Sequence, residues 1–438
     1  MSRSTPRSRG KLGCFLAIIT LVILMLAAIR LPKRSLHPNP QEIPSTTNTK
    51  PGPEWVSAVD RARSIARSAV TDQNLPGLSL AVGVSSRIVW AEGFGWADMD
   101  GRDPVTPDTR FRIGTASTLL TSAAAGTLIQ KGALSLDEEI QTRVPQFPKK
   151  PWPVTIRQLM AGVAGLANDS GDEAPLLRRR CANPVQALPQ FADAPLLFEP
   201  GTQYRTSKYG WILVSAAVEA AAGSPFLTLM NESVFRPLGM DNTGAESSTE
   251  ENPEAVGEEG EDAPIFGFMR HVVLEPLGIA DRKAKPATEP ATIYAPGHGP
   301  QPQFRYGLHV MSPRNLSCYA GSMAFFSTPS DMVRFGLAIN GATLLKPATA
   351  RLLQTPQRLT SGKETGYGLG WRVNTVEIAS RSTQAAGYDG DLLDHRVASF
   401  IMFPETGIVV AVMTNSANAE TSDIAMKVAA AFAQPGRR

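Results

Sequence analysis

The chain has 438 residues, of which 42% are hydrophobic, and its formal net charge at pH 7 is +3. This length suits one large core, or a core with a substantial insertion, after a non-globular start. A charge this close to zero gives no indication of a nucleic-acid partner. None of the five histidines stands in a metal-ligand pattern such as His-Glu-x-x-His, so we predict neither a metal nor a cofactor.

The N-terminal part is expected to lie outside the folded body. Residues 1–11 form a basic tail without acidic side chains, and residues 12–29 carry no charge. Eighteen residues at a 1.5 Å rise span about 27 Å, near the lower limit for a bilayer core, which predicts a transmembrane anchor. Residues 30–53 contain several prolines and few apolar side chains, which predicts a linker.

Two other interpretations of the apolar segment stay open. A cleaved signal peptide needs a small-x-small site, and Ala27-Ala28-Ile29-Arg30 is a poor one. A mitochondrial presequence is free of acidic residues, as this segment is, but it forms an amphipathic helix rather than a long apolar run. We favour the uncleaved anchor. The excess of basic residues before the run predicts a cytoplasmic N-terminus and a globular domain in the periplasm or another extracytoplasmic space.

The folded body is predicted to extend from residue 54 to residue 434, and three local patterns open it. Apolar side chains recur at helical spacing between Trp55 and Ala69, which predicts an amphipathic helix. Two apolar runs, 78–84 and 87–94, are separated by two serines and predict a β-hairpin. An Ala- and Leu-rich run at 118–131 ends at a glycine and predicts a buried helix.

The middle of the body, about 118–320, is predicted to be mostly helical, with an acidic surface loop at 241–264. Because strands are predicted on both sides of this helical region, we expect one sheet built from both chain ends. The predicted fold class is α/β (α+β): an antiparallel sheet flanked by helices, with a mostly helical inserted subdomain. Further helices are predicted at 155–160, 207–222, 227–234, 330–340 and 422–433, and further strands at 368–373, 397–403 and 407–414.

The three cysteines show no paired spacing, so neither a zinc site nor a disulfide framework can be recognised. Cys14 lies in the apolar N-terminal run. We expect Cys181 and Cys318 to be buried free thiols, while a disulfide between them in an oxidising compartment stays the alternative.

Short motifs follow one another along the body, and their order is more specific than any one of them. They are Leu134–Asp137, Thr155–Met160, Pro200–Thr202, Val234–Asp241, Ser327–Met332 and Gly366–Trp371. This order, from about residue 55 to residue 430, resembles the serine β-lactamase and penicillin-binding protein superfamily, especially its class C-like and esterase-like branch. The resemblance implies a β-lactamase/transpeptidase-like fold.

The first catalytic motif of that superfamily is substituted in this chain. The motif is roughly Phe-x-Ile-Gly-Ser-x-x-Lys, in which Ser is the nucleophile and Lys accepts its proton. The chain has Phe111–Thr118 at this place, with Thr115 instead of Ser and Thr118 instead of Lys. A threonine hydroxyl can act as a nucleophile, but Thr118 cannot accept its proton at neutral pH.

The other two motifs are substituted as well. Tyr-x-Asn aligns with Thr206-Ser207-Lys208, and Lys-Thr-Gly or His-x-Gly aligns with Tyr388-Asp389-Gly390. We interpret Lys208 as an ordinary charged lysine; a substitute base, or a partner for a substrate carboxylate, is the alternative. We interpret His395, which follows Asp394, as a strand-end residue because no Gly-x-Ser-x-Gly elbow accompanies it. The resemblance places the family site at Thr115, Thr118, Thr206, Lys208, Tyr388 and Gly390.

Three hypotheses follow for the function. Because the base and its partner are both replaced, we favour a membrane-anchored pseudoenzyme that binds a peptidoglycan-type or small acyl ligand, or a protein partner. The second hypothesis is an active hydrolase of β-lactams, peptidoglycan peptides or esters that uses Thr115 as its nucleophile. The third is a structural assembly protein, by analogy with relatives that polymerise. The sequence leaves open whether the chain is an enzyme.

Overall fold

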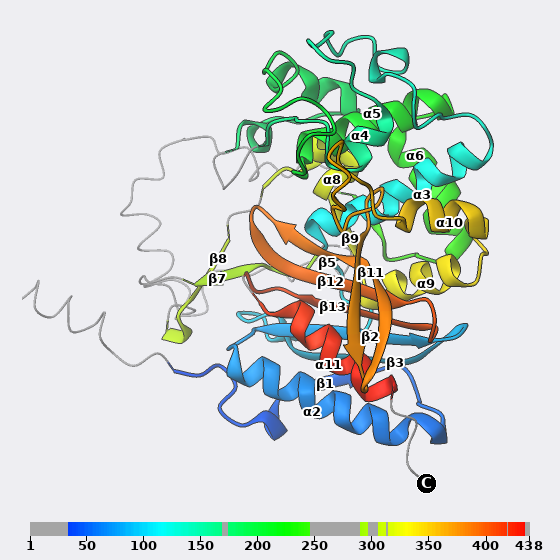
Figure 1. The fold of residues 1–438 in the computed structure, drawn as a ribbon. Coiled ribbons are helices and arrows are strands. Elements are labelled where there is room, and N and C mark those ends of the chain that lie inside the picture. The colour runs from blue at the N-terminus through cyan, green and yellow to red at the C-terminus, as the bar shows by residue number, and fades with distance from the viewer. Residues whose placement is uncertain are drawn as a thin grey trace, which may run out of the picture.

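The computed structural model describes residues 34–168, 174–245, 290–296, 305–311, 314–417 and 419–433 (Figure 1). The predicted basic tail and transmembrane segment, and most of the predicted acidic loop, lie outside these residues. Within them, no single helix is long and apolar enough to cross a bilayer, and one bent pair of helices, 208–222 with 226–238, passes that test together.

An antiparallel sheet lies at the centre of the domain (Figure 1). Its strands follow the order β1-β3-β2-β13-β12-β11-β10, and β4 pairs with β3. The pairing of β2 with β13 joins the N-terminal hairpin to the C-terminal strands, which confirms the predicted sheet built from both chain ends. The strands are β1 (Ser45–Thr47), β2 (Gly77–Val84), β3 (Arg87–Asp98), β4 (Asp103–Pro104), β10 (Arg372–Ile378), β11 (Arg381–Leu392), β12 (His395–Phe403) and β13 (Ile408–Thr414).

Alternating side chains bind a helical layer to each face of the sheet. Leu80 of β2 pairs with Val412 of β13, and both belong to one buried apolar cluster. Helices α2 (Val56–Asp72) and α11 (Thr421–Ala433) supply much of the rest of this cluster, and Figure 1 shows them on the same side of the sheet. Ala81, the next residue along β2, points to the opposite face and belongs to a second cluster.

The helical region covers that opposite face, which agrees with the predicted antiparallel sheet flanked by helices. Its central helix α3 is enclosed on every side, because all of its residues from Ser117 to Leu128 are buried and are apolar or small. The helices are α3 (Ser117–Gln130), α4 (Ile156–Met160), α5 (Lys208–Ala222), α6 (Phe226–Met230), α8 (Ala320–Met323), α9 (Pro329–Asn340) and α10 (Pro347–Gln354). Short strands accompany them: β5 (Phe111–Arg112), β6 (Gly244–Ala245), β7 (Tyr294–Pro296), β8 (Leu308–Val310) and β9 (Phe325–Ser327).

The C-terminal half of the sheet differs from the prediction. Strand β11 is absent from the prediction because its Ser, Thr, Gln, Gly and Asp residues interrupt any apolar alternation. It forms because β10 and β12 pair with its backbone on both sides. The strand predicted at 368–373 begins at Arg372, since the amide of Gly368 donates to the carbonyl of Trp371 at 2.7 Å and closes a turn there.

Part of the predicted linker is packed against the domain, so the prediction for residues 30–53 is wrong over this part. β1 pairs with β3, with Ser45 opposite Phe94. Arg67 of α2 donates from Nη1 to the carbonyls of Pro40, at 2.8 Å, and Ile43, at 3.0 Å. A single guanidinium thus binds several backbone carbonyls of this segment, which its composition does not indicate.

The start of the predicted acidic loop is also ordered by the domain. The amide of Asn242 and the hydroxyl of Thr243 both donate to Oδ2 of Asp331, each at 2.9 Å. Residues 244–245 form β6, which pairs with β9. The remaining part of the loop, from residue 246, lies outside the described ranges.

The prediction of free thiols at Cys181 and Cys318 is wrong. The two cysteines form a disulfide with a Cα–Cα distance of 4.7 Å and a sequence separation of 137 residues. The Cys181 amide also donates to Oγ of Ser317, at 3.0 Å, beside the second cysteine. Tertiary packing brings the two segments together, which is why the spacing of the cysteines gave no indication of the bond.

Replacing both cysteines by alanine is expected to lower the free energy of unfolding by about 2–4 kcal/mol, because the disulfide restricts the unfolded chain over a long loop. Urea denaturation of the double variant measures this, and Cys14→Ser, with the disulfide intact, is the matched control. An unchanged unfolding midpoint in the double variant would contradict a native disulfide.

Candidate active site

The candidate site is built where the start of α3 touches strand β11. Thr115 lies in the 3-10 turn Gly114–Ala116, which leads directly into α3. Gly114 has a φ of +51°, and a Cβ there would lie 2.4 Å from the carbonyl oxygen of Asp391. Gly390 is equally constrained, since a Cβ would lie 2.1 Å from the carbonyl oxygen of Ile113. Two glycines therefore let the two backbones meet.

The hydroxyl of Thr115 is hydrogen-bonded to β11 on both sides. Its Oγ1 donates to the carbonyl of Asp389 at 3.1 Å and accepts from the amide of Asp391 at 2.9 Å. A carbonyl oxygen cannot remove a proton at neutral pH, so the donated proton has no base to receive it. The Asp391 N–H is the type of backbone donor that stabilises an oxyanion in acyl transfer. In this structure, the Asp391 N–H already donates its hydrogen bond to the Thr115 hydroxyl.

Thr118 makes no contribution to proton transfer in this arrangement. Its side chain is buried, and its Oγ1 donates to the carbonyl of Thr115 at 2.9 Å. A threonine in the first turn of a helix commonly makes this bond to its own backbone. The side chain one turn after the nucleophile position is therefore part of the helix start rather than a base.

Tyr388 and Thr206 meet on the other side of the site. Burial raises the pKa of Tyr388, while the Arg372 guanidinium and a hydrogen bond with the Thr206 side chain lower it by less. The rings of Tyr388 and Tyr367 are 5.7 Å apart, and those of Tyr367 and Tyr204 are 5.5 Å apart. Burial also raises the pKa of Tyr204 and, well above its ordinary value, that of Tyr367. These phenols are neutral at physiological pH.

Lys208 is held in an ion pair. It is the first residue of α5, whose N-terminus is capped by Ser207 Oγ accepting from the amide of Gly210 at 3.1 Å. The Lys208 side chain is only 7% exposed, and its Nζ donates to Oδ1 of Asp394 at 3.2 Å. Asp394 lies in the turn between β11 and β12. The pair supports the interpretation of a charged lysine, and it joins the helical region to the sheet.

The predicted positions are connected through α3 and β11. Thr118 contacts Thr115, and Gly390 lies against Ile113 beside Thr115. Tyr388 and Thr206 contact each other, and Lys208 pairs with Asp394 in the β11–β12 turn. His395 is the first residue of β12, which confirms its placement at a strand end. Sequence patterns did not indicate the backbone of Asp389 and Asp391, or the carboxylate of Asp389. That carboxylate points to the other face of the sheet, where Ser399 and Ser422 donate to it at 2.6 and 2.8 Å.

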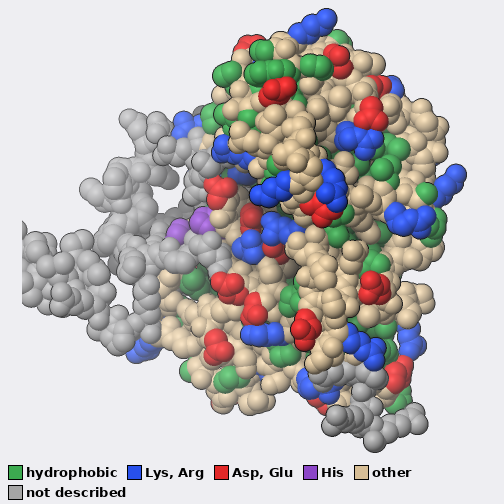
Figure 2. Space-filling view, in the orientation of Figure 1, with side chains coloured by type: hydrophobic (Ala, Val, Ile, Leu, Met, Phe, Trp, Pro, Cys, Tyr) green, Lys and Arg blue, Asp and Glu red, His purple; other side chains and the backbone are tan. Residues whose placement is uncertain are grey.

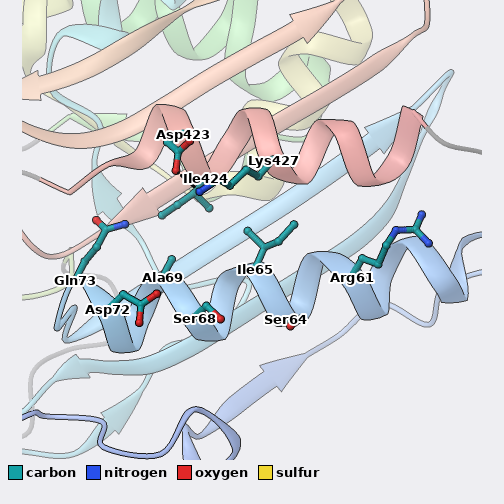
Figure 3. Close-up of a pocket in the computed structure, with 10 residues that line it drawn as sticks. All are labelled: Arg61, Ser64, Ile65, Ser68, Ala69, Asp72, Gln73, Asp423, Ile424 and Lys427. Carbon is teal, nitrogen blue, oxygen red and sulfur yellow. Dashed lines mark ion pairs between the residues drawn. The ribbon is translucent and has the colours of Figure 1, made fainter. Parts of the chain in front are cut away.

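No metal-binding group was found within the described ranges, where no three His, Cys, Asp or Glu side chains cluster suitably. A groove of about 470 Å³ lies between α2 and α11 (Figure 3). It contains side chains of both charges, and Lys427 pairs with Asp423 at 2.7 Å inside it. Because α2 and α11 cover the opposite face of the sheet from α3, this groove is separate from the Thr115 site.

Comparison with known proteins identifies the class. The Beta-lactamase family model matches residues 62–434, so the chain belongs to this family of β-lactamase-related serine hydrolases. This confirms the predicted resemblance. Among individual proteins, the chain is similar to the human "Serine beta-lactamase-like protein LACTB, mitochondrial", with 23% identity over an alignment of 480 positions. The alignment covers 86% of this chain and 80% of that protein.

Two further similarities cover most of the chain. Esterase EstB of Burkholderia gladioli is 24% identical over 388 residues, which cover 82% of this chain and 91% of the esterase. The solved structure of the octameric penicillin-binding protein homologue from Pyrococcus abyssi has a TM-score of 0.63 at 20% identity, covering 86% of this chain and 77% of that one. The structural likeness supports the β-lactamase/transpeptidase-like fold.

Asp394→Asn is expected to lower the free energy of unfolding by about 1–2 kcal/mol, because it removes a carboxylate that pairs with the buried ammonium group of Lys208. Lys208→Met is expected to cost less, since it removes the buried charge and keeps the apolar stem packed. Chemical denaturation of both variants tests this order. A larger loss for Lys208→Met than for Asp394→Asn would contradict it.

Proposed function

We propose that this protein is a membrane-anchored member of the β-lactamase-related serine hydrolase family whose catalytic centre is impaired, and that it acts by binding a ligand or a partner. One observation carries the proposal: the Thr115 hydroxyl donates to the carbonyl of Asp389 and accepts from the amide of Asp391. The nucleophile position is therefore used for a structural hydrogen bond.

Among the residues that the structure describes, the side chains around Thr115 offer no replacement for the missing base. Thr118 donates to the backbone, and the amine of Lys208 is paired with Asp394. Burial keeps the Tyr388 phenol protonated because it raises the pKa of that group. Removing a nucleophile or base that acts as part of a unit costs on the order of 10⁶ in rate. Binding alone survives such a loss, so we assign binding as the function.

The ligand class follows from the relatives' names. Proteins similar to this chain are called a penicillin-binding protein, an esterase and a serine β-lactamase-like protein. We therefore propose a peptidoglycan-type or small acyl ligand, with a protein partner as the alternative occupant.

The similar penicillin-binding protein homologue from Pyrococcus abyssi is octameric. Assembly is therefore a further proposal for this chain, which light scattering across a concentration series tests.

The proposed location is the extracytoplasmic side of a membrane. The uncharged segment 12–29 supports the anchor, and the disulfide between Cys181 and Cys318 supports an oxidising compartment. Mass-tag alkylation of protein taken directly from cells is expected to modify one cysteine, Cys14, without reductant and all three after reduction. Modification of all three without reductant would contradict this location.

Incubation with a fluorescent penicillin and with a fluorophosphonate is expected to give no covalent label, because the Thr115 hydroxyl has no proton acceptor. In-gel fluorescence measures this, with an active relative such as a penicillin-binding protein as the positive control. Labelling that disappears in Thr115→Ala would contradict the proposed function and support the active hydrolase.

The double variant Thr115→Ser, Thr118→Lys is expected to gain weak acylation by the fluorescent penicillin, since it restores both the nucleophile and its base. Thr115→Ser alone is the matched control and should stay unlabelled, because it lacks the base. If the single variant is labelled as strongly as the double variant, the absence of a base is not what blocks the chemistry.

A further inference from the structure

A groove runs between α2 and α11 on the face of the sheet that lies opposite to the candidate active site (Figure 3). Its α2 wall is a stripe of side chains at helical spacing, so they lie along one side of the helix. They are Arg61, Ser64, Ile65, Ser68 and Asp72. The serines at the middle of the stripe are exposed and small, which lets a second helix approach α2 closely at this point.

Opposite charges stand at the two ends of this stripe. Arg61 and Asp72 lie about 16 Å apart along the axis of α2, too far to pair with each other. The Arg61 guanidinium donates from Nη1 to Ser57 Oγ and from Nη2 to the Ala431 carbonyl, each at 2.8 Å. These bonds use two of the five N–H groups that a guanidinium has. Asp72 is exposed, and among the described residues its carboxylate forms no ion pair. Both charges are therefore available to a partner.

Helix α11 forms the other wall of the groove and runs antiparallel to α2. Its C-terminal end lies at Arg61, through the bond to Ala431. Just before its N-terminal end, the amide of Glu420 donates to Gln73 Oε1 at 2.9 Å. The middle of α11 therefore lies beside the middle of the α2 stripe.

This middle of α11 carries its own pair of opposite charges. Asp423 and Lys427 line the groove, are exposed, and pair with each other at 2.7 Å. With the helices aligned as above, their midpoint lies within about one residue of the midpoint between Arg61 and Asp72. Figure 2 shows acidic and basic side chains interspersed over the lower part of the molecule, where Figure 1 places α2 and α11. Both pairs of charges are thus arranged about one point.

We propose that this face binds a second copy of the chain, with the two α2 helices antiparallel. A two-fold axis through the common midpoint maps each charge onto its opposite. Arg61 of each copy then lies opposite Asp72 of the other, and Asp423 lies opposite Lys427. The small side chains of the stripe meet at the centre, where the helices approach most closely. The charges also fix the orientation, because parallel helices would place like charges together.

The proposal rests on the assembly proposed for this chain, and it is independent of the state of the Thr115 site. The two helices are about 25 and 20 Å long and together about 20 Å wide, so each copy contributes about 500 Å² to the contact. A stable complex buries about 800 Å² on each partner. We therefore expect a weak dimer that dissociates on dilution and at high salt.

Sedimentation equilibrium of the full chain in density-matched detergent, over a concentration series, measures the dissociation constant of the dimer. Arg61→Asp and Asp72→Arg are each expected to raise it about tenfold, because each reversal places like charges together on both sides of the axis. The double variant with both changes restores both pairs and is expected to dimerise as the unmodified chain does. Because the two positions cannot meet within one chain, this rescue identifies a contact between copies.

Arg351→Asp is the matched control, since Arg351 is exposed on α10, in the helical region on the other side of the sheet. It should leave dimerisation unchanged. If circular dichroism shows that Arg61→Asp has unfolded, Asp72→Arg, a change at an exposed position, carries the test alone.

A chain that stays monomeric at every concentration would overturn both this interface and the proposed assembly. Assembly that Asp72→Arg does not weaken, or that a folded double variant does not restore, would overturn this interface alone. Penicillin labelling of Thr115, with the charge rescue intact, would overturn the impaired centre and leave the interface standing.

Discussion

The contact on which the site depends is that between the Thr115 turn and the backbone of β11. Gly114 and Gly390 allow the two segments to approach to a distance that a single Cβ atom would prevent. Once they are in contact, the Thr115 hydroxyl is within reach of one carbonyl and one amide of the same strand. The turn also starts helix α3, around which the helical region is packed. One contact therefore joins the sheet, the central helix and the site.

The same geometry is consistent with the proposed loss of the family's usual proton transfer in a chain that keeps the family fold. A hydroxyl between a carbonyl and an amide is fully satisfied, and it stabilises the position of the helix start whether or not any reaction occurs. A nucleophile would instead need its proton directed at a base. Thr118 and Thr206 reinforce this outcome, since each bonds to a neighbour and neither ionises at neutral pH. Their hydroxyls contribute structure where the family pattern has proton-transfer groups.

The charged and titratable side chains at the site differ from those of the family motifs. Tyr388 stands where that pattern has a lysine or a histidine, and burial keeps it neutral by raising its pKa. Lys208 is a cation, but it is paired with Asp394 across the boundary between helices and sheet. Arg372 on β10 is the cation beside the Tyr388 ring.

Much of the architecture follows from local patterns in the sequence. The amphipathic helix, the first hairpin, the buried helix α3 and the use of both chain ends in one sheet are all predicted by periodicity. Strand β11 is not predicted, because its polar residues form contacts with Thr115, Ser399 and Arg396 and show no apolar alternation. The same strand contains the backbone groups of Asp389 and Asp391 that bind Thr115, which the sequence did not indicate.

Long-range contacts account for the other differences. The disulfide joins residues 137 positions apart, and Arg67 binds carbonyls of a segment more than 20 residues earlier. The local sequence around these residues does not indicate either contact. Lys208 and Asp394 likewise meet only after α5 and the β11–β12 turn have been placed. Such contacts depend on topology, which single-sequence periodicity does not determine.

Hydrogen exchange at the Asp391 amide tests most directly whether the Thr115 hydroxyl is committed to β11. Exchange is measured in the unmodified chain and in Thr115→Val, which keeps the shape of the side chain and removes its hydroxyl. The amide is expected to exchange slowly in the unmodified chain and faster in the variant, because its acceptor is lost. Equal exchange rates in the two proteins would show that the hydroxyl is free to act as a nucleophile and would contradict the impaired centre.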